Sequence, residues 1–521
     1  MKTFLKLLLL ILCNVPLGAA GQWVADMGDG TYRNPIIHAD YSDPDVVRVG
    51  DDYWMVASSF CHMPGIPVLH SRDLVNWEIV SHVYPRLDSR KFDRVAHGEG
   101  SWAPAMAWHD GLYYVYFCTP TEGLFVATAA DPRGPWSLRQ MAEAAKWEDP
   151  APFWDEDGQA YLLRSQHRGG PAILHRMSAD GLRLLDDGVT VYLDTKANPV
   201  LEGMKMLKRD GWYYISAPAG GVSNGWQTLL RSRDIYGPYE ARRVLEAGDN
   251  GVNGPHQGAL VDTPDGREWW FVHFQSKGIH GRIIHLQPAR WLADGWLEIG
   301  DPADPGHPVL TYRKPAIDVK VTPHGPQTSD TFNLPELGLQ WQWQANPRPE
   351  WWSLTDRPGW MRLNVVSCPS EGGNLYYAPN LLMQKLPAPT FTATTLVETH
   401  FCAPTDRAGL VMYGTEYSFI ALSDGKIFVA EGKGDTRYPG HLREVASVEN
   451  SGNKAWLRVE LLDGDLCRYS YSLDGETFTV LGPDCKVTPG VWVGAKVGIF
   501  ASSPSLVPSC GYADFERFDI K

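Results

Sequence analysis

The stretch 34-NPIIHADYSDPDVVRVGDDYWMVASSF-60 decides the fold of this chain. It contains an acidic turn at Asp43-Pro44-Asp45, a short apolar run, a Gly-Asp-Asp turn and a second run rich in Tyr, Trp and Val. β-Branched and aromatic residues favour strands, and Gly and Asp tend to end them. The stretch therefore predicts a hairpin of two strands joined by a tight turn.

This strand–turn–strand unit recurs along the first 300 residues. After each Gly/Asp turn comes a doublet that is aromatic at one or both positions: Tyr53-Trp54, Tyr113-Tyr114, Ala160-Tyr161, Tyr213-Tyr214 and Trp269-Trp270. The second members of these doublets are 60, 47, 53 and 56 residues apart. A loose period of about 40–60 residues is typical of a β-propeller. Five units predict five blades over residues 30–300.

The repeat also indicates where chemistry is expected. Ten or eleven residues before each doublet lies the expected start of that unit's first strand. The residues at these positions are Asp43, Trp102, Asp149, Glu202 and Gly258, the last two residues after His256. If the first strands line the central channel, three carboxylates, a tryptophan and a histidine surround one end of one axis. This spacing predicts an active site.

Composition limits the possible functions. The chain has 521 residues and a net charge of −14, with 44% hydrophobic and 21% charged residues. These values indicate a globular protein large enough for more than one domain. No long Lys/Arg cluster is present, which argues against nucleic acid or an anionic membrane surface as partner.

The N-terminus resembles a secretory signal peptide over residues 1–20. Lys2 and Lys6 precede an apolar run that ends in Gly18-Ala19-Ala20, which predicts cleavage after Ala20 and export to the periplasm or the extracellular space. A lipoprotein anchor at Cys13 is the alternative, disfavoured by Leu12 before it. No other apolar stretch approaches the roughly 20 residues needed to span a bilayer.

Seven cysteines remain after the leader, and none forms a Cys-x-x-Cys pair, so zinc is not supported. Five of them lie beyond residue 360, where one or two disulfides are expected in an exported chain. Because the count is odd, at least one cysteine is free or pairs between chains.

A second domain is predicted after a linker. Residues 301–330 are rich in proline and are interpreted as the linker. From residue 331 to 521, alternating runs such as 392–401 and 456–462 are separated by Asp-Gly turns and do not repeat at blade spacing. This pattern is typical of a β-sandwich, so the chain is predicted to be all-β. The aromatic-rich stretch 339–354 is core or a sugar-stacking surface, with core favoured.

The three carboxylates have structural as well as catalytic interpretations. Asp43 and Asp149 each precede proline, a common turn pattern, and Glu202 could pair with Lys205. Glycoside hydrolysis needs one protonated and one ionised carboxyl group, and a third nearby raises the pKa of the acid. Their equivalent placement in three units favours the catalytic interpretation.

Other residues near these positions allow more than one role. Trp102 is core or stacks on a sugar, and Phe60 is core or a sugar platform. His256 is a satisfied channel histidine, a substrate hydrogen-bond partner or a metal ligand. Arg282 closes a surface ion pair or donates to sugar hydroxyls.

A competing motif is the sequence Gly-Val-Ser-Asn-Gly at 221–225, which matches the nucleophile elbow of esterases. That motif requires a strand before it and a helix after it. Here the residues that follow, WQTLLRSRD, have the pattern of a strand, so the esterase interpretation is disfavoured.

Several segments of the chain resemble glycoside hydrolase family 43, whose members are five-bladed propeller enzymes with a three-carboxylate site. The segments that carry the resemblance run in the family order over residues 33–300: ADYSDPDVVRVGDDYW, SWAPA, EDPAPFWDEDGQAYL, LEGMKMLKRDGWYY, GPHQG and GRIIHLQPARW. The tail resembles the concanavalin-like β-sandwich that follows the propeller in β-xylosidase-type members, through WSLTDRPGWMRL and YSLDGETFTVLG.

The resemblance implies catalytic roles for the three carboxylates. Asp43 matches the general base that activates water, Asp149 the residue that tunes the pKa of the acid and orients it, and Glu202 the general acid. Hydrolysis with inversion at the anomeric carbon is expected.

The resemblance also implies binding roles. Phe60, Trp102, Ala103 and Arg282 match positions that shape the pocket for the terminal sugar. His256 matches the axial histidine near which some members hold a calcium ion; no other cofactor is expected.

The implied substrates are terminal α-L-arabinofuranosyl or β-D-xylosyl units of plant cell-wall polysaccharides, removed from chain ends because the second domain helps to block the channel. An endo-acting arabinanase and a non-catalytic carbohydrate-binding propeller are the alternatives. Two departures from the family pattern lie near the pocket: Glu202-Gly203-Met204 replaces Glu-Gly-Pro, and Gly220-Gly221-Val222 replaces Gly-Gly-Thr. They leave the identity of the sugar open.

Overall fold

A computed structural model describes residues 21–368, 373–434 and 442–521. The predicted signal peptide and Cys13 lie outside these residues. The described helical segments are single 3₁₀ turns: η1 (Arg90–Asp93), η2 (Gly278–His280), η3 (Pro349–Trp351) and η5 (Leu375–Tyr377). Within the described ranges, no helix has the length and apolar character needed to cross a membrane. The all-β prediction is confirmed.

Five four-stranded antiparallel sheets, each in sequence order, form the propeller. Their strands are β2 (Asp45–Val49), β3 (Asp52–Val56), β4 (Gly65–Ser71), β5 (Glu78–Tyr84); β6 (Trp102–His109), β7 (Leu112–Thr119), β8 (Gly123–Ala129), β9 (Ser137–Ala142); β10 (Trp147–Trp154), β11 (Ala160–Gln166), β12 (Ala172–Met177), β13 (Val189–Tyr192); β14 (Lys205–Arg209), β15 (Trp212–Ala219), β16 (Trp226–Ser232), β17 (Glu240–Leu245); β18 (His256–Asp262), β19 (Trp269–Ser276), β20 (Arg282–Trp291), β21 (Leu297–Ile299).

The predicted doublets lie in the second strand of every blade, as the hairpin interpretation requires. Their aromatic side chains fill the space between blades. Trp54 of the first blade, for example, belongs to the same buried cluster as Val115 and Phe117 of the second. Burial of such side chains stabilises each blade against its neighbour by roughly 25 cal/mol per Å² of apolar surface. The prediction of five blades is confirmed.

The two ends of the propeller are tied to each other. Strand β1 (Thr31–Arg33) pairs antiparallel with β22 (Thr311–Arg313). The Asn34 side chain donates to the carbonyls of Leu286 and Val309 at 2.8 and 2.9 Å and accepts from the Leu286 N–H at 2.8 Å. The first residues of the domain therefore hold its last blade.

The stretch 301–330, predicted as a linker, packs against both domains. It contains β22, and the Gln327 side chain bonds both main-chain groups of Ile79 on the first blade at 2.9 Å. At its end, Asp330 exchanges main-chain hydrogen bonds with Phe518 of the second domain. This stretch is therefore part of the contact between the domains.

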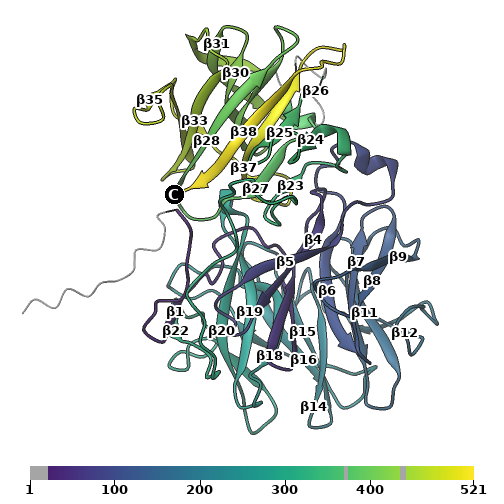
Figure 1. Cartoon of the computed structure of the whole chain (residues 1–521). Helices are drawn as coiled ribbons and strands as arrows, with labels where there is room; N and C mark the ends of the chain where they lie inside the picture. The colour runs from purple at the N-terminus through teal and green to yellow at the C-terminus, as the bar shows by residue number, and fades with distance from the viewer. Residues whose placement is uncertain (1–20, 369–372, 435–441) are drawn as a thin grey trace, which may run out of the picture.

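The C-terminal domain is a sandwich of two sheets (Figure 1). One contains β23 (Gln342–Trp343), β27 (Leu382–Lys385), β37 (Lys496–Ser503), β29 (Arg407–Tyr413), β30 (Glu416–Ser423), β31 (Lys426–Lys433) and β32 (Arg443–Glu449), with β26 (Val366–Ser367) beside β37. The other contains β24 (Trp352–Ser353), β25 (Met361–Asn364), β38 (Tyr512–Ile520), β28 (Phe391–His400), β33 (Lys454–Leu462), β34 (Leu466–Ser472) and β35 (Thr479–Val480), with β36 (Cys485–Lys486) beside β34.

The aromatic-rich stretch 339–354 lies in the core of this sandwich. Trp341, Trp343 and Trp351 are buried in the cluster that joins the two sheets. The core interpretation is confirmed, and these rings do not form a sugar-binding surface.

The sandwich is stacked on one end of the propeller (Figure 1). The Met63 N–H donates to the Trp343 carbonyl at 2.9 Å, and the Asn346 side chain donates to the Leu87 carbonyl at 2.9 Å. Main-chain polar groups at this contact are thus paired with groups of the other domain, as buried polar groups need to be.

A disulfide joins Cys402, just after β28, to Cys510, just before β38. The sequence predicted one or two disulfides in this domain, and one is present in the described part of it. Cys61, Cys118, Cys467 and Cys485 are buried and outside any disulfide.

Removing this disulfide is expected to destabilise the sandwich. The bond closes a loop with a sequence separation of 108 residues, and loss of such a cross-link costs about 2–5 kcal/mol. A Cys402→Ala/Cys510→Ala variant should therefore melt at a lower temperature than the wild type in calorimetry. Adding a reductant should lower the wild-type melting temperature and leave that of the variant unchanged. Equal melting temperatures for both proteins would contradict the assignment.

Candidate active site

The main chain enters the first strand of each blade through a residue with positive φ. The angles are 56° at Asp43, 35° at Ala103, 54° at Asp149, 56° at Gly203 and 40° at Gln257. This left-handed region is unfavourable for side chains other than glycine, and such strain collects at functional sites. The five positions mark one end of the propeller axis.

These positions show that the three carboxylates are not all equivalent, although the sequence analysis predicted that they would be. Asp43 and Asp149 are themselves the left-handed residues, whereas Glu202 comes one residue before left-handed Gly203. By position, Glu202 corresponds to Trp102 and His256. The sequence analysis missed this offset because it counted back either ten or eleven residues: left-handed Gly203 lies ten residues before Tyr213, as Asp43 lies ten before Tyr53, whereas Glu202 lies eleven before Tyr213.

A cavity of about 430 Å³ opens at this end of the axis. Its walls come from all five blades and from one residue of the sandwich: Asp43, Phe60, Trp102, Ala103, Glu148, Asp149, His167, Arg168, Val200, Glu202, Gly221, Val222, Gln257, Arg282 and Trp492. Seven of the eight predicted site residues line it. His256 does not; it is buried and 1% exposed.

Asp43 is held by three donors. Its Oδ2 accepts from Ser58 Oγ at 2.6 Å and from Ser42 Oγ at 3.0 Å, and its Oδ1 accepts from Arg282 Nη1 at 2.6 Å. Only 5% of the residue is exposed. These bonds fix the plane of the carboxylate against the pocket.

Arg282 is bonded to protein groups through one of its guanidinium nitrogens, Nη1. The same Nη1 also donates to Ser42 Oγ at 2.6 Å, and the guanidinium carbon lies 5.0 Å from the centre of the Phe274 ring. The predicted ion pair exists, but it is a buried pair with Asp43 and not a surface pair. Arg282 therefore orients Asp43 and still borders the pocket.

Asp149 lies near two other carboxylates, and the groups that donate hydrogen bonds to it are uncharged. Its Oδ2 accepts from the Gly203 N–H at 2.6 Å and from Ser165 Oγ at 3.3 Å. Burial, followed by the nearby charges of Glu202 and Glu148, raises the pKa of Asp149 well above its ordinary value, and the Gly203 bond only partly opposes this. A carboxyl group in this setting favours its protonated form.

Glu202 contacts a histidine and not the predicted lysine. Glu202 Oε1 lies 3.2 Å from His256 Nε2, within ion-pair distance but outside hydrogen-bond geometry. Lys205 instead lies 3.5 Å from Asp45 at the start of the first blade. The alternative that Glu202 is a structural partner of Lys205 is therefore wrong, and the carboxyl group faces the pocket.

His256 lies behind Glu202, where a metal ion was expected. In the described residues, no group of three or more His, Cys, Asp or Glu side chains is arranged to hold a metal ion. Both ring nitrogens of His256 are buried without a hydrogen-bond partner. A calcium ion near His256 therefore stays a prediction.

Aromatic side chains form two walls of the pocket. Trp102 donates from Nε1 to the Gly98 carbonyl at 2.9 Å and stacks against His167 at 6.0 Å. Trp492 reaches the pocket from the sandwich, with 54% of its surface exposed. A methyl group on Gly98 would lie 2.9 Å from Trp492 Cδ1, so glycine there leaves room for Trp492 against the propeller. Phe60 is 4% exposed and forms part of the wall from within the core.

Several pocket residues were missed by the sequence analysis. Glu148 is a fourth carboxylate; burial raises its pKa, and its Oε1 lies 2.7 Å from His167 Nδ1. Its position directly before Asp149 was a signal that could have identified it. Trp492 gave no comparable signal, because its approach to the propeller depends on how the two domains pack.

Comparison with known proteins gives consistent results. The family model "Glycosyl hydrolases family 43" matches residues 32–297, and "Beta xylosidase C-terminal Concanavalin A-like domain" matches residues 329–521. A protein named "Putative beta-xylosidase" from Xylanibacter ruminicola is 47% identical over 91% of this chain and 86% of its own length. The non-reducing end alpha-L-arabinofuranosidase BoGH43B of Bacteroides ovatus is 30% identical over 77% of each chain.

A solved structure shows the same architecture. The crystal structure of the GH43 BlXynB protein from Bacillus licheniformis superposes with a TM-score of 0.83 at 26% identity, covering 94% of this chain and 99% of that one. Both domains of the present chain are therefore matched together.

The raised pKa of Asp149 predicts a pH-dependent effect of Asp149→Asn on stability. Below the ordinary carboxyl pKa of 3.8 both residues are neutral; as pH rises, the wild type must ionise a buried carboxyl group in the folded state, and the variant need not. The melting temperature of the variant relative to the wild type should therefore increase from pH 4 to pH 8.

Asp26→Asn is a control of opposite sign. Burial opposes ionisation of Asp26, but bonds from Lys314 and Asn76 outweigh it and lower the pKa of this carboxyl group. Because this lowered pKa lies below the ordinary value of 3.8, the melting temperature of Asp26→Asn relative to the wild type should fall as pH rises toward about 5 and then stay level to pH 8. The same trend in both variants would contradict the assignment for Asp149.

Proposed function

The chain belongs to glycosyl hydrolase family 43, and on that premise we propose that this glycoside hydrolase removes terminal β-D-xylosyl residues from xylan-type plant polysaccharides and their fragments. The relative named as a beta-xylosidase, at 47% identity, supports this sugar. Terminal α-L-arabinofuranosyl residues are the second candidate, supported by the named activity of the Bacteroides ovatus relative.

The observation that carries the proposal is one pocket bordered by Asp43, Asp149 and Glu202 with a wall from a second domain. Its volume of about 430 Å³ lies within the range of small-molecule sites. Because Trp492 of the sandwich closes one side, the pocket favours the end of a chain over an internal segment. This arrangement supports exo action over the endo-acting arabinanase alternative.

In the proposed reaction, Asp43 is the general base. It takes a proton from a water molecule as the water oxygen attacks the anomeric carbon of the terminal sugar. The bonds from Ser42, Ser58 and Arg282 hold the accepting oxygens in place during attack. Pre-set orientation of this kind removes entropy that the uncatalysed reaction has to lose.

Glu202 is the proposed general acid. It donates a proton to the glycosidic oxygen as the bond between that oxygen and the anomeric carbon breaks, so the leaving sugar departs as a neutral alcohol. Asp43 then holds the proton from water and Glu202 is ionised, and exchange with solvent restores both. Water enters opposite the leaving group, which gives inversion.

Asp149 assists the acid through charge. Burial, followed by the nearby charges of Glu202 and Glu148, raises the pKa of Asp149, so its carboxyl group favours the protonated form beside the proposed acid. No step depends on calcium.

Export is part of the proposal. The N-terminal lysines and apolar run have the pattern of a signal peptide, and the disulfide between Cys402 and Cys510 suits an oxidising compartment outside the cytoplasm. A polysaccharide-degrading enzyme meets its substrate there.

The substrate assignment is tested with two aryl glycosides compared side by side. Wild type should release aryl alcohol from aryl β-D-xyloside faster than from aryl α-L-arabinofuranoside, and Asp43→Ala should lose about 10²- to 10⁴-fold in rate, the contribution of a general base. Proton NMR of the first product should show the inverted anomer, and xylo-oligosaccharides should lose single terminal sugars. Cleavage of neither glycoside, or cleavage inside the chain, would reject the proposal.

The acid role of Glu202 is tested by varying the leaving group. Glu202→Ala should lose about 10²- to 10⁴-fold on xylo-oligosaccharides, but about tenfold or less on aryl glycosides whose leaving groups need little protonation. Rates are measured as kcat/KM over a series of phenols of decreasing pKa. Equal losses on all substrates would exclude Glu202 as the acid.

A further inference from the structure

Two short main-chain segments meet where the propeller touches the sandwich close to the pocket. The Ala495 N–H donates to the Ile279 carbonyl at 2.7 Å. A methyl group on Gly281 would lie 2.7 Å from the Gly494 nitrogen, and one on Gly494 would lie 2.7 Å from the Gly281 nitrogen. The segments are so close that only glycine fits on either side. We call this contact the glycine seam.

The side chain of Asp40 bridges the glycine seam. Asp40 Oδ1 accepts the main-chain N–H of Arg282 on the propeller at 2.8 Å, and Oδ2 accepts the main-chain N–H of Gly494 on the sandwich at 2.9 Å. The residue is 3% exposed. Each carboxylate oxygen thus bonds a different domain, and hydrogen bonds to a buried charge are stronger than those between neutral groups.

Both main-chain N–H groups that Asp40 bonds belong to segments that line the pocket. On the propeller side, the residue bonded through its main chain is Arg282, whose side chain holds Asp43 at 2.6 Å. On the sandwich side, Gly494 is two residues from Trp492, which lines the pocket from that domain. A shift at the seam would therefore move both the proposed base and the wall that contains Trp492.

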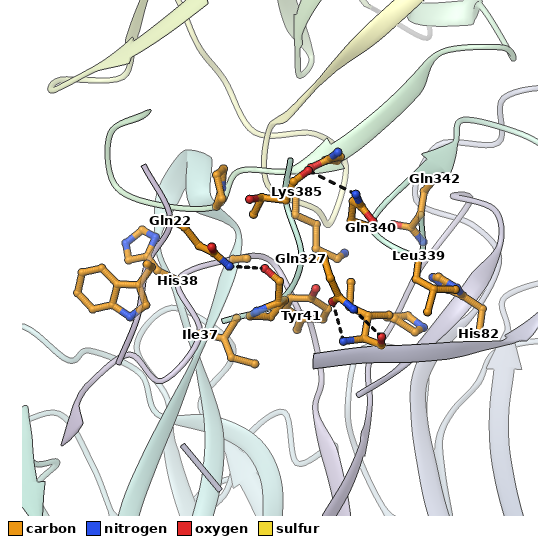
Figure 2. Close-up of a pocket in the computed structure, with 18 residues that line it drawn as sticks. Gln22, Ile37, His38, Tyr41, His82, Gln327, Leu339, Gln340, Gln342 and Lys385 are labelled. Carbon is orange, nitrogen blue, oxygen red and sulfur yellow. Dashed lines mark hydrogen bonds between the residues drawn. The ribbon is translucent and has the colours of Figure 1, made fainter. Parts of the chain in front are cut away.

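The charge of Asp40 acts on two buried lysines at the same interface. Burial and then the charge of Lys385 lower the pKa of Lys496 to about 7, and the charge of Asp40 works against this. Figure 2 shows Lys385 beside Tyr41, the neighbour of Asp40, in a small cavity between the domains. A neutral residue at position 40 would remove the carboxylate charge that opposes the lowered pKa of both lysines.

We propose that Asp40 is a positioning residue that holds the Arg282 segment of the propeller and the Trp492 segment of the sandwich in one fixed placement around the substrate. The inference rests on the proposed function, since it assigns these segments to a glycosidase pocket. It assigns Asp40 no contact with the substrate. Asparagine cannot replace it, because one of the two N–H donors would then face an amide NH₂.

The test compares Asp40→Asn with Asp406→Asn. Asp406 is an equally buried carboxylate that accepts the N–H groups of Cys402 and Ala403 at 3.1 Å within the sandwich, and it lines no part of the pocket. Asp40→Asn should lose about 100-fold in kcat/KM, the effect of displacing catalytic groups by about 1 Å. Asp406→Asn should retain wild-type activity.

Hydrogen exchange provides a readout that does not need substrate. Amides in peptides covering 279–283 and 490–496 should exchange about 10- to 100-fold faster in Asp40→Asn, the factor expected for one lost charge-assisted hydrogen bond. Asp406→Asn should leave both peptides at wild-type rates. Unchanged exchange in Asp40→Asn would overturn the proposal even if the wild type cleaved neither glycoside, so failure of the proposed function remains distinguishable.

Two further variants separate positioning from general destabilisation. In a Trp492→Ala background, Asp40→Asn should cost less activity than in the wild type, because part of its effect acts through Trp492. Gly494→Ala is the substitute if Asp40→Asn does not fold. It separates the seam while retaining Asp40, and it should show the same faster exchange in both peptides. The proposal would be rejected if the activity losses of Asp40→Asn and Trp492→Ala were fully additive and the seam amides of Gly494→Ala exchanged at wild-type rates.

Discussion

The left-handed main chain at the head of each inner strand is the constraint on which the site depends. Each non-glycine residue held there costs about 1–3 kcal/mol, which the surrounding structure has to offset. At Asp43 the offset comes from two hydroxyls and a guanidinium, and at Asp149 from the Gly203 N–H and Ser165. The bonds that stabilise the strained main chain are thus the bonds that orient the carboxyl groups. Fold and chemistry share the same contacts.

The two aspartates have the same backbone conformation but different partners, and this difference separates their roles. Asp43 contacts a guanidinium that stays charged at any pH of interest. Asp149 is buried, contacts neutral donors and faces the charges of Glu202 and Glu148, so its pKa is raised. The proposed base and the carboxyl group beside the proposed acid thus share a backbone conformation but differ in their surroundings. The five-fold repeat sets the positions of these carboxyl groups, and the neighbouring residues set their hydrogen bonds and charges.

Much of the fold and part of the candidate site were predictable from the sequence. The hairpin doublets gave the blade count because turn chemistry and alternating aromatic residues act locally, within about ten residues. The carboxylates followed from the same periodicity. The offset of Glu202 was missed, because a count of ten or eleven residues does not distinguish Glu202 from the left-handed Gly203 that follows it. Nor was the partner of Arg282, since the sequence gives no distance between residues 43 and 282.

The place of Trp492 in the pocket could not be predicted from the repeat in the sequence. It lies in a loop before β37 with a φ of 65°, on a domain that has no repeat in common with the propeller. Its place in the pocket is set by the glycine seam and by contact with Gly98, both of which join residues hundreds of positions apart. A wall carried by the sandwich can change in shape without disturbing the carboxylates carried by the blades. A substitution at Trp492 can therefore change the shape of the pocket while the three carboxyl groups keep their own contacts.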